Sequence, residues 1–349
     1  MTNTLHISIA AQSDNLGDVE IRRQLIEQFL QRGYGLVVFA GSMPKPYIDA
    51  FHLPAGSKVI SNPIAFQMAV VRNALLGRAS LAYAPGPHIL TDSPKSLAKA
   101  AAVLGLCALV RIRGGSLSVI GRSLRGSGRI SIGLERALSA MATSYAMRDT
   151  ASAPVLGRSA DVMPDMAFLR NASLDNGNVA ADRDIVALSF RSDRDVNLDG
   201  LASLVSESHA RGLKPVLITQ VRRDDKRHAD LSKRLGIEAV LWENRTHVEQ
   251  EEVIEHYYSR SHAVVSNRLH SLLFGVAHQA FPVALHEEKQ NKIPTTLKPW
   301  VDFDSLVLEN PDFAFLGRTE DDRKDLGNSA KAAGTALGNY ISSKVPDFS

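Results

Sequence analysis

Short runs of apolar and β-branched residues alternate along the chain with longer segments in which apolar residues recur every three or four positions. The first run spans 4–11, and the helical pattern that follows it spans 16–33 and ends at Gly33. Further strand-like runs lie at 35–41, 57–62, 80–86, 116–121 and 144–149, with an amphipathic helical pattern at 131–143. Alternating strands and helices predict a parallel sheet that is covered by helices on both faces.

A second series of strands and helices begins at 183–191. It continues through strand-like runs at 214–220, 237–242, 262–267 and 281–286, and through helical patterns at 198–211, 225–235, 248–259 and 268–277. We expect an α/β protein with two doubly wound, Rossmann-like domains, at 1–170 and 184–310, and a cleft between them. The polar stretch 171–183 is the expected linker, and 311–349 is the expected C-terminal helical segment.

Composition narrows the class of protein. The 349 residues exceed the length of about 250–300 at which one core stops growing, which favours two domains. A net charge of +3 is too small to indicate nucleic-acid binding. The single cysteine, Cys107, excludes a disulfide within the chain and a multi-thiolate metal site. The first residues do not resemble a signal peptide, and the longest apolar run, 100–110, is too short to span a bilayer, so we expect a cytoplasmic protein.

Common nucleotide and metal motifs are missing from the sequence. No G-x-G-x-x-G follows the first strand, and neither a P-loop nor a G-x-S-x-G turn is present. The segment 286–290 begins like a zinc-protease motif but has Gln290 where the second histidine would stand. Two D-x-D pairs, at 193–195 and 302–304, lack further ligands, so we expect no metal site.

Ligands of doubly wound sheets bind beyond the carboxyl ends of the strands. Charge or glycine lies at five such positions: 13–18, 85–88, 148–149, 189–195 and 266–270. Three of these positions, 13–18, 148–149 and 266–270, belong to an ordered set of four motifs. The motifs are Asn15-x-Gly17-Asp18, R-D-x-x-S at 148–152, P-D-x-A-F at 164–168, and S-x-R-L-H at 266–270 before a proline-led strand. This set resembles the polysaccharide pyruvyltransferase family, over roughly residues 5 to 292.

The resemblance implies transfer of a pyruvyl group from phosphoenolpyruvate to two hydroxyls of a sugar, which forms a cyclic ketal and releases phosphate. It implies a fold similar to the two-domain GT-B glycosyltransferases, a cell-surface polysaccharide or its lipid-linked precursor as acceptor, and no cofactor besides the donor. One departure concerns 84–88, APGPH, where many members carry a glycine triplet. Pro85 and Pro87 remove backbone donors there, which argues against a backbone cradle for an anion.

Phosphoenolpyruvate carries a phosphate and a carboxylate, and arginine pairs with both groups in a bidentate manner. Arg148 and Arg268 are the candidates for this role, and His270 is the candidate acid or base. Lys289 matches a family lysine that would assist phosphate departure, with Lys292 as the competing lysine. The remaining candidates for substrate contact are Asn15, Gly17, Asp18, Ser266, Asn267, Arg191 and His88.

Each candidate also has a structural interpretation. Arg148 could pair with Asp149, and His270 could be a packed histidine. Asn15 and Asp18 could cap the first helix, and Lys289 could be a surface charge.

From Ser93 to Leu134 there is no acidic residue, whereas seven Lys and Arg residues occur there: Lys95, Lys99, Arg111, Arg113, Arg122, Arg125 and Arg129. Such a stretch would suit a lipid-linked, anionic acceptor and peripheral contact with the inner face of a membrane. The alternative is a solvated basic surface. The sequence carries no information on oligomeric state.

Two other functions compete with pyruvyl transfer. The first is a GT-B glycosyltransferase that uses a nucleotide sugar, with Glu287 or Glu288 placed for the ribose hydroxyls. The second is an inactive member that binds an anionic glycan, for which the altered 84–88 segment is the main support.

Overall fold

The computed structural model describes residues 3–157, 160–173, 183–286 and 292–349. The chain forms two compact units. The first comprises Met1–Ser13, Asp18–Met166 and Ala336–Ser349, and the second comprises Asp14–Gly17 and Ala167–Thr335. The sequence predicts neither the assignment of the short segment Asp14–Gly17 to the second unit nor the division of the last helix after Thr335.

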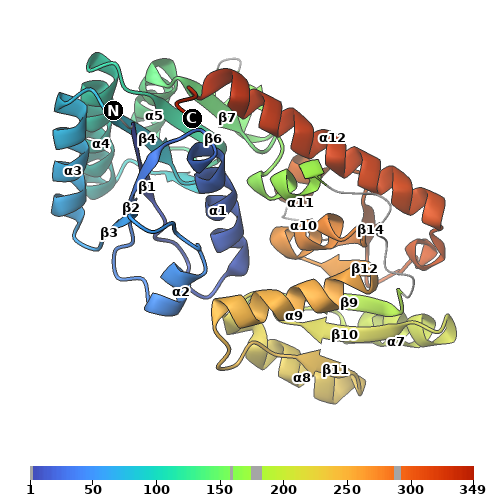
Figure 1. The fold of residues 1–349 in the computed structure, drawn as a ribbon. Helices are drawn as coiled ribbons and strands as arrows, with labels where there is room; N and C mark the ends of the chain where they lie inside the picture. The colour runs from blue at the N-terminus through green and yellow to red at the C-terminus, as the bar shows by residue number, and fades with distance from the viewer. Residues whose placement is uncertain (1–2, 158–159, 174–182, 287–291) are drawn as a thin grey trace. The chain divides into compact units, whose positions relative to one another are not determined.

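The first unit contains an eight-stranded parallel sheet (Figure 1). Its main path runs in the order β3-β2-β1-β4-β6-β7-β8, and β5 pairs with β6 off this path. The strands are β1 Thr4–Ser8, β2 Gly35–Phe39, β3 Lys58–Ile60, β4 Ala79–Tyr83, β5 Gly86–Leu90, β6 Leu117–Gly126, β7 Ser144–Met147 and β8 Asp161–Val162. The helices are α1 Leu16–Leu30, α2 Lys45–Asp49, α3 Pro63–Leu75, α4 Pro94–Ile112, α5 Arg129–Met141 and α6 Ser152–Leu156.

The second unit contains a six-stranded parallel sheet in the order β11-β10-β9-β12-β13-β14. Its strands are β9 Ile185–Ser189, β10 Lys214–Ile218, β11 Glu238–Val240, β12 Ser261–Ser266, β13 Phe281–Leu285 and β14 Asp304–Leu306. Its helices are α7 Leu198–Ala210, α8 Asp225–Leu235, α9 His247–Ser259, α10 Leu269–Ala277 and α11 Lys292–Leu297, and α12 Glu320–Lys344 runs from this unit into the first. Three 3-10 segments, Met166–Ser173, Arg222–Asp224 and Ala314–Gly317, complete the elements.

Both sheets confirm the predicted α/β class with two Rossmann-like domains. In each sheet the first strand in sequence lies in the interior and the strand order reverses beside it, next to β4 in one unit and β12 in the other. Every residue of β9 and β13 is buried, because helices cover both faces of the sheet. Parallel strands buried on both faces are uniformly apolar, and this is why the runs were recognisable in the sequence.

Several details differ from the sequence prediction. The expected strand 80–86 is divided into β4 and β5, since the chain turns at Ala84 and Pro85 and Gly86 has a positive φ of 125°. The glycines of α12 do not interrupt it. A Cβ on Gly334 would lie 2.3 Å from the carbonyl oxygen of Phe168, so this glycine permits close packing of the helix. Among the described residues, no helix is both long and apolar enough to cross a bilayer.

Candidate functional site

The carboxyl ends of β9 and β12 meet at the point where the strand order of the second sheet reverses. Ser189 and Ser266 are register partners at the two strand ends. Crevices outside such reversals are the usual ligand sites of doubly wound sheets. The S-x-R-L-H motif continues directly from Ser266 into α10 and therefore lies at this position.

Ser266 and Asn267 join the two strand-end loops to each other. The hydroxyl of Ser266 donates to the carbonyl oxygen of Ser189 at 2.5 Å and accepts from the backbone N–H of Arg268 at 2.9 Å. The side-chain oxygen of Asn267 accepts from the backbone N–H of Arg191 at 2.9 Å. Both side chains are buried, so these contacts hold the loops in place. Contact of Ser266 and Asn267 with a substrate stays a prediction.

Arg268 is fixed by Asp224, which lies in the 3-10 turn after β10. Its Nη2 donates to Oδ1 of Asp224 at 2.7 Å, and its Nε donates to Oδ2. The Asp224 side chain is fully buried, whereas that of Arg268 is 12% exposed. Asp224 also accepts from the backbone N–H of Ser192 at 2.9 Å. Asp224 therefore orients the guanidinium of Arg268 beside the loop that follows β9.

Asp224 is not among the residues that the sequence motifs indicate. It lies in the polar segment 222–225, shortly after the end of β10, so the rule that ligands bind beyond strand ends applies to it as well. Its partner Arg268 is 44 residues away in the sequence, and no local pattern indicates this pairing.

His228 of α8 binds the start of the loop that follows β9. Its Nε2 accepts from the backbone N–H of Phe190 at 2.9 Å, and its Nδ1 lies 2.8 Å from the hydroxyl oxygen of Thr219. Burial lowers the pKa of His228 to about 4. The ring is therefore neutral near pH 7, which suits acceptance of the Phe190 N–H.

Lowering the pH from about 7 to about 5 is expected to destabilise the second unit through His228. In this interval the unfolded chain, with an ordinary histidine pKa of 6.5, binds a proton that the folded chain excludes. The stabilisation is complete above the unfolded pKa and is lost as the pH falls toward the folded value. At about 1.4 kcal/mol per pH unit, roughly 2 kcal/mol is lost by pH 5.

Urea unfolding at the two pH values tests this effect in the wild type and in His228→Gln, whose amide accepts a hydrogen bond but does not titrate. Both tryptophans, Trp242 and Trp300, lie in the second unit, so their fluorescence reports its unfolding. An equal pH dependence in the two proteins would contradict the assignment to His228.

The segment Asp14–Gly17 is attached to the loop that follows β10. Asn15 forms an antiparallel bridge with Val221, and its side-chain oxygen accepts from Gln220 at 2.8 Å. The same oxygen accepts from the backbone N–H of Gly17 at 3.0 Å, so Asn15 also caps α1. Asp14 pairs with Arg223 through two bonds of 2.6 Å. Burial alone would raise the pKa of Asp14, but the Arg223 guanidinium brings it below its usual value.

Gly17 allows His270 to approach the start of α1. A Cβ on Gly17 would lie 2.2 Å from Nδ1 of His270, which is far inside contact distance. The half-buried His270 ring, in the first turn of α10, therefore packs directly on the backbone of Gly17. The structure thus joins the first and last motifs of the predicted set. Asp18, also in that set, instead pairs with Arg22 at 3.0 Å within α1.

Arg191 pairs with Asp193 on the loop after β9. Its Nε and Nη2 donate to the two carboxylate oxygens at 2.8 and 2.7 Å. These hydrogen bonds lower the pKa of Asp193 to about 2. The side chain of Arg191 is about one-third exposed, and its predicted contact with substrate stays a prediction. In the described parts of the chain, no cluster of three or more acidic, histidine or cysteine side chains could hold a metal ion.

Arg148 belongs to the first unit and is fully buried. Its Nη1 donates to Oδ2 of Asp165 at 2.6 Å, which joins the R-D-x-x-S and P-D-x-A-F motifs. Asp149 instead accepts from the hydroxyl of Ser152 at 2.8 Å, so the alternative pairing of Arg148 with Asp149 is wrong. The Nη2 atom of Arg125 lies 3.6 Å from Oδ2 of Asp149. Donor contact by Arg148 stays a prediction, and the observed contact joins two segments of the same unit.

His88, on β5, lies beside a buried polar cluster of the first unit. Its Nε2 is 3.7 Å from Glu135, which accepts from Arg122 at 2.8 Å and from Tyr145 at 2.7 Å. Burial, assisted by the charge of Arg122, lowers the pKa of His88 to about 4. His88 is therefore neutral at pH 7 and would meet a substrate as a hydrogen-bonding group.

The candidate lysine Lys289 and the alternative glutamates Glu287 and Glu288 fall outside the described residues. The competing Lys292 begins α11, and its carbonyl oxygen accepts from Thr296 at 2.7 Å.

The sequence matches no family model and no curated protein. Among solved structures, a UDP-GlcNAc 2-epimerase from Neisseria meningitidis bound to UDP-GlcNAc has a TM-score of 0.56 at 9% identity, covering 98% of this chain and 100% of that chain. S. aureus MnaA with UDP has a TM-score of 0.53 at 10% identity, with both chains covered completely. Acinetobacter baumannii MurG has a TM-score of 0.50 at 9% identity, covering 98% of this chain and 100% of that chain.

These structures share the two-domain architecture of the chain. The chain has the GT-B fold. At about one identical residue in ten, the likeness concerns the fold alone.

Proposed function

We propose that the chain is a GT-B-fold transferase of glycan synthesis, which binds an anionic donor at the carboxyl edge of the second sheet and transfers a group from it to a sugar. The observation that carries this proposal is the arrangement of Arg268 and His270 at the reversal of strand order. Asp224 holds the guanidinium of Arg268, and Gly17 allows the ring of His270 to lie close by. A fixed cation and a titratable group in the first turn of one helix suit an anionic donor that reacts through proton transfer.

We propose phosphoenolpyruvate as the donor, on the strength of the S-x-R-L-H motif. A proton is added to the methylene carbon of the enol, and C2 becomes electrophilic. Oxygens of two sugar hydroxyls then bond to C2, the C2–O bond to phosphate breaks, and both hydroxyl protons are released. The products are a methyl-bearing ketal and inorganic phosphate. In this scheme Arg268 pairs with an anionic group of the donor, and His270 moves a proton to the carbon or from a hydroxyl.

A nucleotide sugar is the second candidate donor, and the similar solved structures favour it. The epimerase from Neisseria meningitidis is bound to UDP-GlcNAc, and S. aureus MnaA is bound to UDP. A diphosphate would also pair with Arg268 and would face the N-terminus of α10. The α10 start has no glycine between Arg268 and Ser271, so the backbone approach of a diphosphate would be less close than at a glycine-rich turn.

Calorimetric titration of the full chain with phosphoenolpyruvate and with UDP-GlcNAc distinguishes the two donors. We expect saturable binding of phosphoenolpyruvate, weakened about 10- to 100-fold in Arg268→Lys, because an ammonium cannot keep two parallel hydrogen bonds to Asp224 and present further donors to the anion. Arg211→Lys is the matched control, since Arg211 is an exposed arginine of the same unit paired with Glu207.

Three other outcomes would revise the proposal. Binding of UDP-GlcNAc but not of phosphoenolpyruvate, again lost in Arg268→Lys, would replace pyruvyl transfer by glycosyl transfer or epimerisation. Binding of either donor with no effect of Arg268→Lys would place the site elsewhere. Binding of neither donor, with or without a glycan present, would support the inactive glycan-binding alternative.

A further inference from the structure

Helix α3 presents apolar side chains to solvent. Its inward side includes the buried Val70 and Ala74. On the outer side lie Ile64, Met68, Leu75 and, just beyond the helix, Leu76, which are 66%, 67%, 56% and 55% exposed. Spacings of four and seven residues place Ile64, Met68 and Leu75 along one stripe, and Leu76 follows as the C-cap residue. The helix is thus apolar on the side where a surface helix normally carries polar residues.

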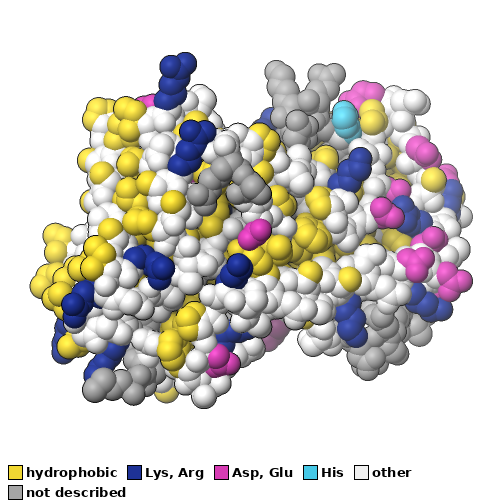
Figure 2. All heavy atoms as spheres, turned by 90° about the horizontal axis from the view of Figure 1, so that it is seen from above, with side chains coloured by type: hydrophobic (Ala, Val, Ile, Leu, Met, Phe, Trp, Pro, Cys, Tyr) yellow, Lys and Arg dark blue, Asp and Glu magenta, His cyan; other side chains and the backbone are white. Residues whose placement is uncertain are grey.

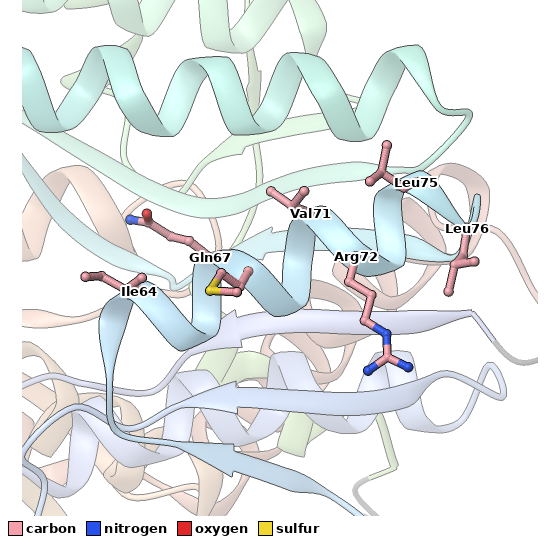
Figure 3. A pocket seen from close by; sticks show the side chains of 7 residues that line it. Ile64, Gln67, Val71, Arg72, Leu75 and Leu76 are labelled. Atoms are coloured by element: carbon pink, nitrogen blue, oxygen red, sulfur yellow. The ribbon is translucent and has the colours of Figure 1, made fainter.

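A surface hollow of about 700 Å³ follows this stripe (Figure 3). The same four apolar side chains line it, together with Gln67, Val71 and Arg72. We call the surface formed by Ile64, Met68, Arg72, Leu75 and Leu76 the α3 face. The α3 face is an exposed apolar strip that carries one cation, Arg72.

Basic residues outnumber acidic residues in the sequence around the α3 face, and one of them contacts it directly. Between Asp49 and Glu135 the chain has ten Lys and Arg residues and a single acidic residue, Asp92. Asp92 accepts hydrogen bonds from the backbone at the start of α5. At the end of α4, the guanidinium of Arg113 donates to the carbonyl oxygen of Leu75 at 3.0 Å. Its neighbour Ile112 is 81% exposed, so the end of α4 adds both charge and apolar surface beside the α3 face.

The space-filling view agrees with this arrangement. In Figure 2, hydrophobic side chains gather at the left-hand edge, on the side of the first unit where α3 and α4 lie in Figure 1, with Lys and Arg side chains among them. Exposed apolar side chains gathered in one patch, rather than scattered singly, mark surfaces that bind a partner or a membrane.

We propose that the α3 face and the end of α4 form a docking surface for an anionic lipid bilayer. Apolar side chains that enter the acyl boundary, with cations at headgroup level, are the combination by which surface helices bind anionic membranes. Each Lys or Arg near such a surface strengthens the attraction to anionic lipids, and the apolar side chains add the free energy of their burial. This proposal does not depend on which donor the second unit binds.

A second copy of this chain fits the α3 face less well. A twofold dimer would place the α3 face against itself and would bring the Arg72 and Arg113 side chains of both copies into one contact region. The sequence from Phe51 to Thr91, which contains all of α3, has no acidic residue to pair with them. A bilayer of anionic lipids instead supplies negative charge over the whole contact.

Co-sedimentation of the full chain with lipid vesicles tests this proposal. We expect binding to vesicles of equal parts phosphatidylcholine and phosphatidylglycerol, and little binding to phosphatidylcholine alone. The double variant Met68→Ser, Leu75→Ser should lower the partition coefficient at least about tenfold, because two large apolar side chains no longer enter the bilayer. Val307→Ser is the control, since Val307 is an exposed apolar residue of the second unit.

Salt provides a test that needs no substitution. Raising NaCl from about 0.1 M to about 1 M shortens the Debye length from about 10 Å to about 3 Å and should release the wild type from anionic vesicles. Equal binding to both kinds of vesicle, or equal binding by the double variant, would overturn the proposal. Self-association without vesicles that the double variant abolishes would assign the α3 face to a second copy instead.

Discussion

Arg268→Ala is expected to lower the free energy of unfolding of the second unit by about 3–5 kcal/mol and to abolish donor binding. The substitution removes the cation that pairs with the fully buried carboxylate of Asp224, to which the backbone N–H of Ser192 still donates. A buried carboxylate that loses its cation keeps its desolvation cost without the compensating attraction. Urea unfolding followed by tryptophan fluorescence measures the loss.

A double-mutant cycle separates the ion pair from general damage. Because Asp224→Ala removes the carboxylate that Arg268→Ala leaves unpaired, the double variant should be destabilised by less than the sum of the single variants. Arg211→Ala, which breaks an exposed pair with Glu207, should change the free energy of unfolding by less than about 1 kcal/mol. Additive effects of Arg268→Ala and Asp224→Ala would show that the two side chains do not act as a pair.

Gly17→Ala is expected to reduce kcat/KM at least about 100-fold while leaving the second unit folded. The added Cβ would meet Nδ1 of His270 at 2.2 Å and its Cγ at 2.4 Å, so the ring must move away. Displacing a catalytic group by about 1 Å can lower the rate of proton transfer by about 100-fold. Release of phosphate from phosphoenolpyruvate, or of UDP from a nucleotide sugar, in the presence of a glycan acceptor measures the effect.

Gly133→Ala is the matched control for this substitution. Gly133 lies within α5, a Cβ there meets no atom within 4 Å, and alanine is the better helix former. His270→Gln should lower kcat/KM to a similar extent as Gly17→Ala, and the double variant should be little worse than either, because both changes disable one group. Wild-type turnover in Gly17→Ala would contradict a role for His270 in proton transfer.

Much of the fold was predictable from the sequence because it depends on local patterns. Strands buried on both faces read as apolar runs, such as 185–189 and 281–285, and the helices between them carry a clear period. The weaker predictions concern short elements that the tertiary structure creates. β5 exists through its pairing with β6, and β8 has two residues, so neither has a pattern of its own.

The sequence predicts the site residues that directly follow a strand, but not the buried residues that hold them in place. Ser266, Asn267, Arg268 and His270 were selected because polar residues directly follow a buried strand. Asp224 and His228 were missed, although both are buried and hold this same region. Their sequence signal is weak, since charged or polar residues commonly follow strands or lie in helices. Only their burial, which the sequence does not show, marks them as unusual.

For the α3 face, the sequence does not reveal which apolar residues stay exposed. Its sequence, PIAFQMAVVRNAL, is apolar over nearly its whole length and reads as a well-packed helix. Which of its residues remain exposed depends on how the helix sits on the sheet and beside α4. The basic stretch 93–134 was visible in the sequence, but the apolar strip next to Arg113 was not.

The sequence by itself determined the α/β class, the two parallel sheets, the succession of their main strands along the chain and the position of the motif residues at strand ends. These properties follow from apolar periodicity and from the chemistry of single residues, both of which are local. Tertiary structure alone decided that Arg268 pairs with Asp224, that Arg148 pairs with Asp165 and that His270 packs on Gly17. These contacts join positions 44, 17 and more than 250 residues apart, and only the packing of whole elements brings such positions together.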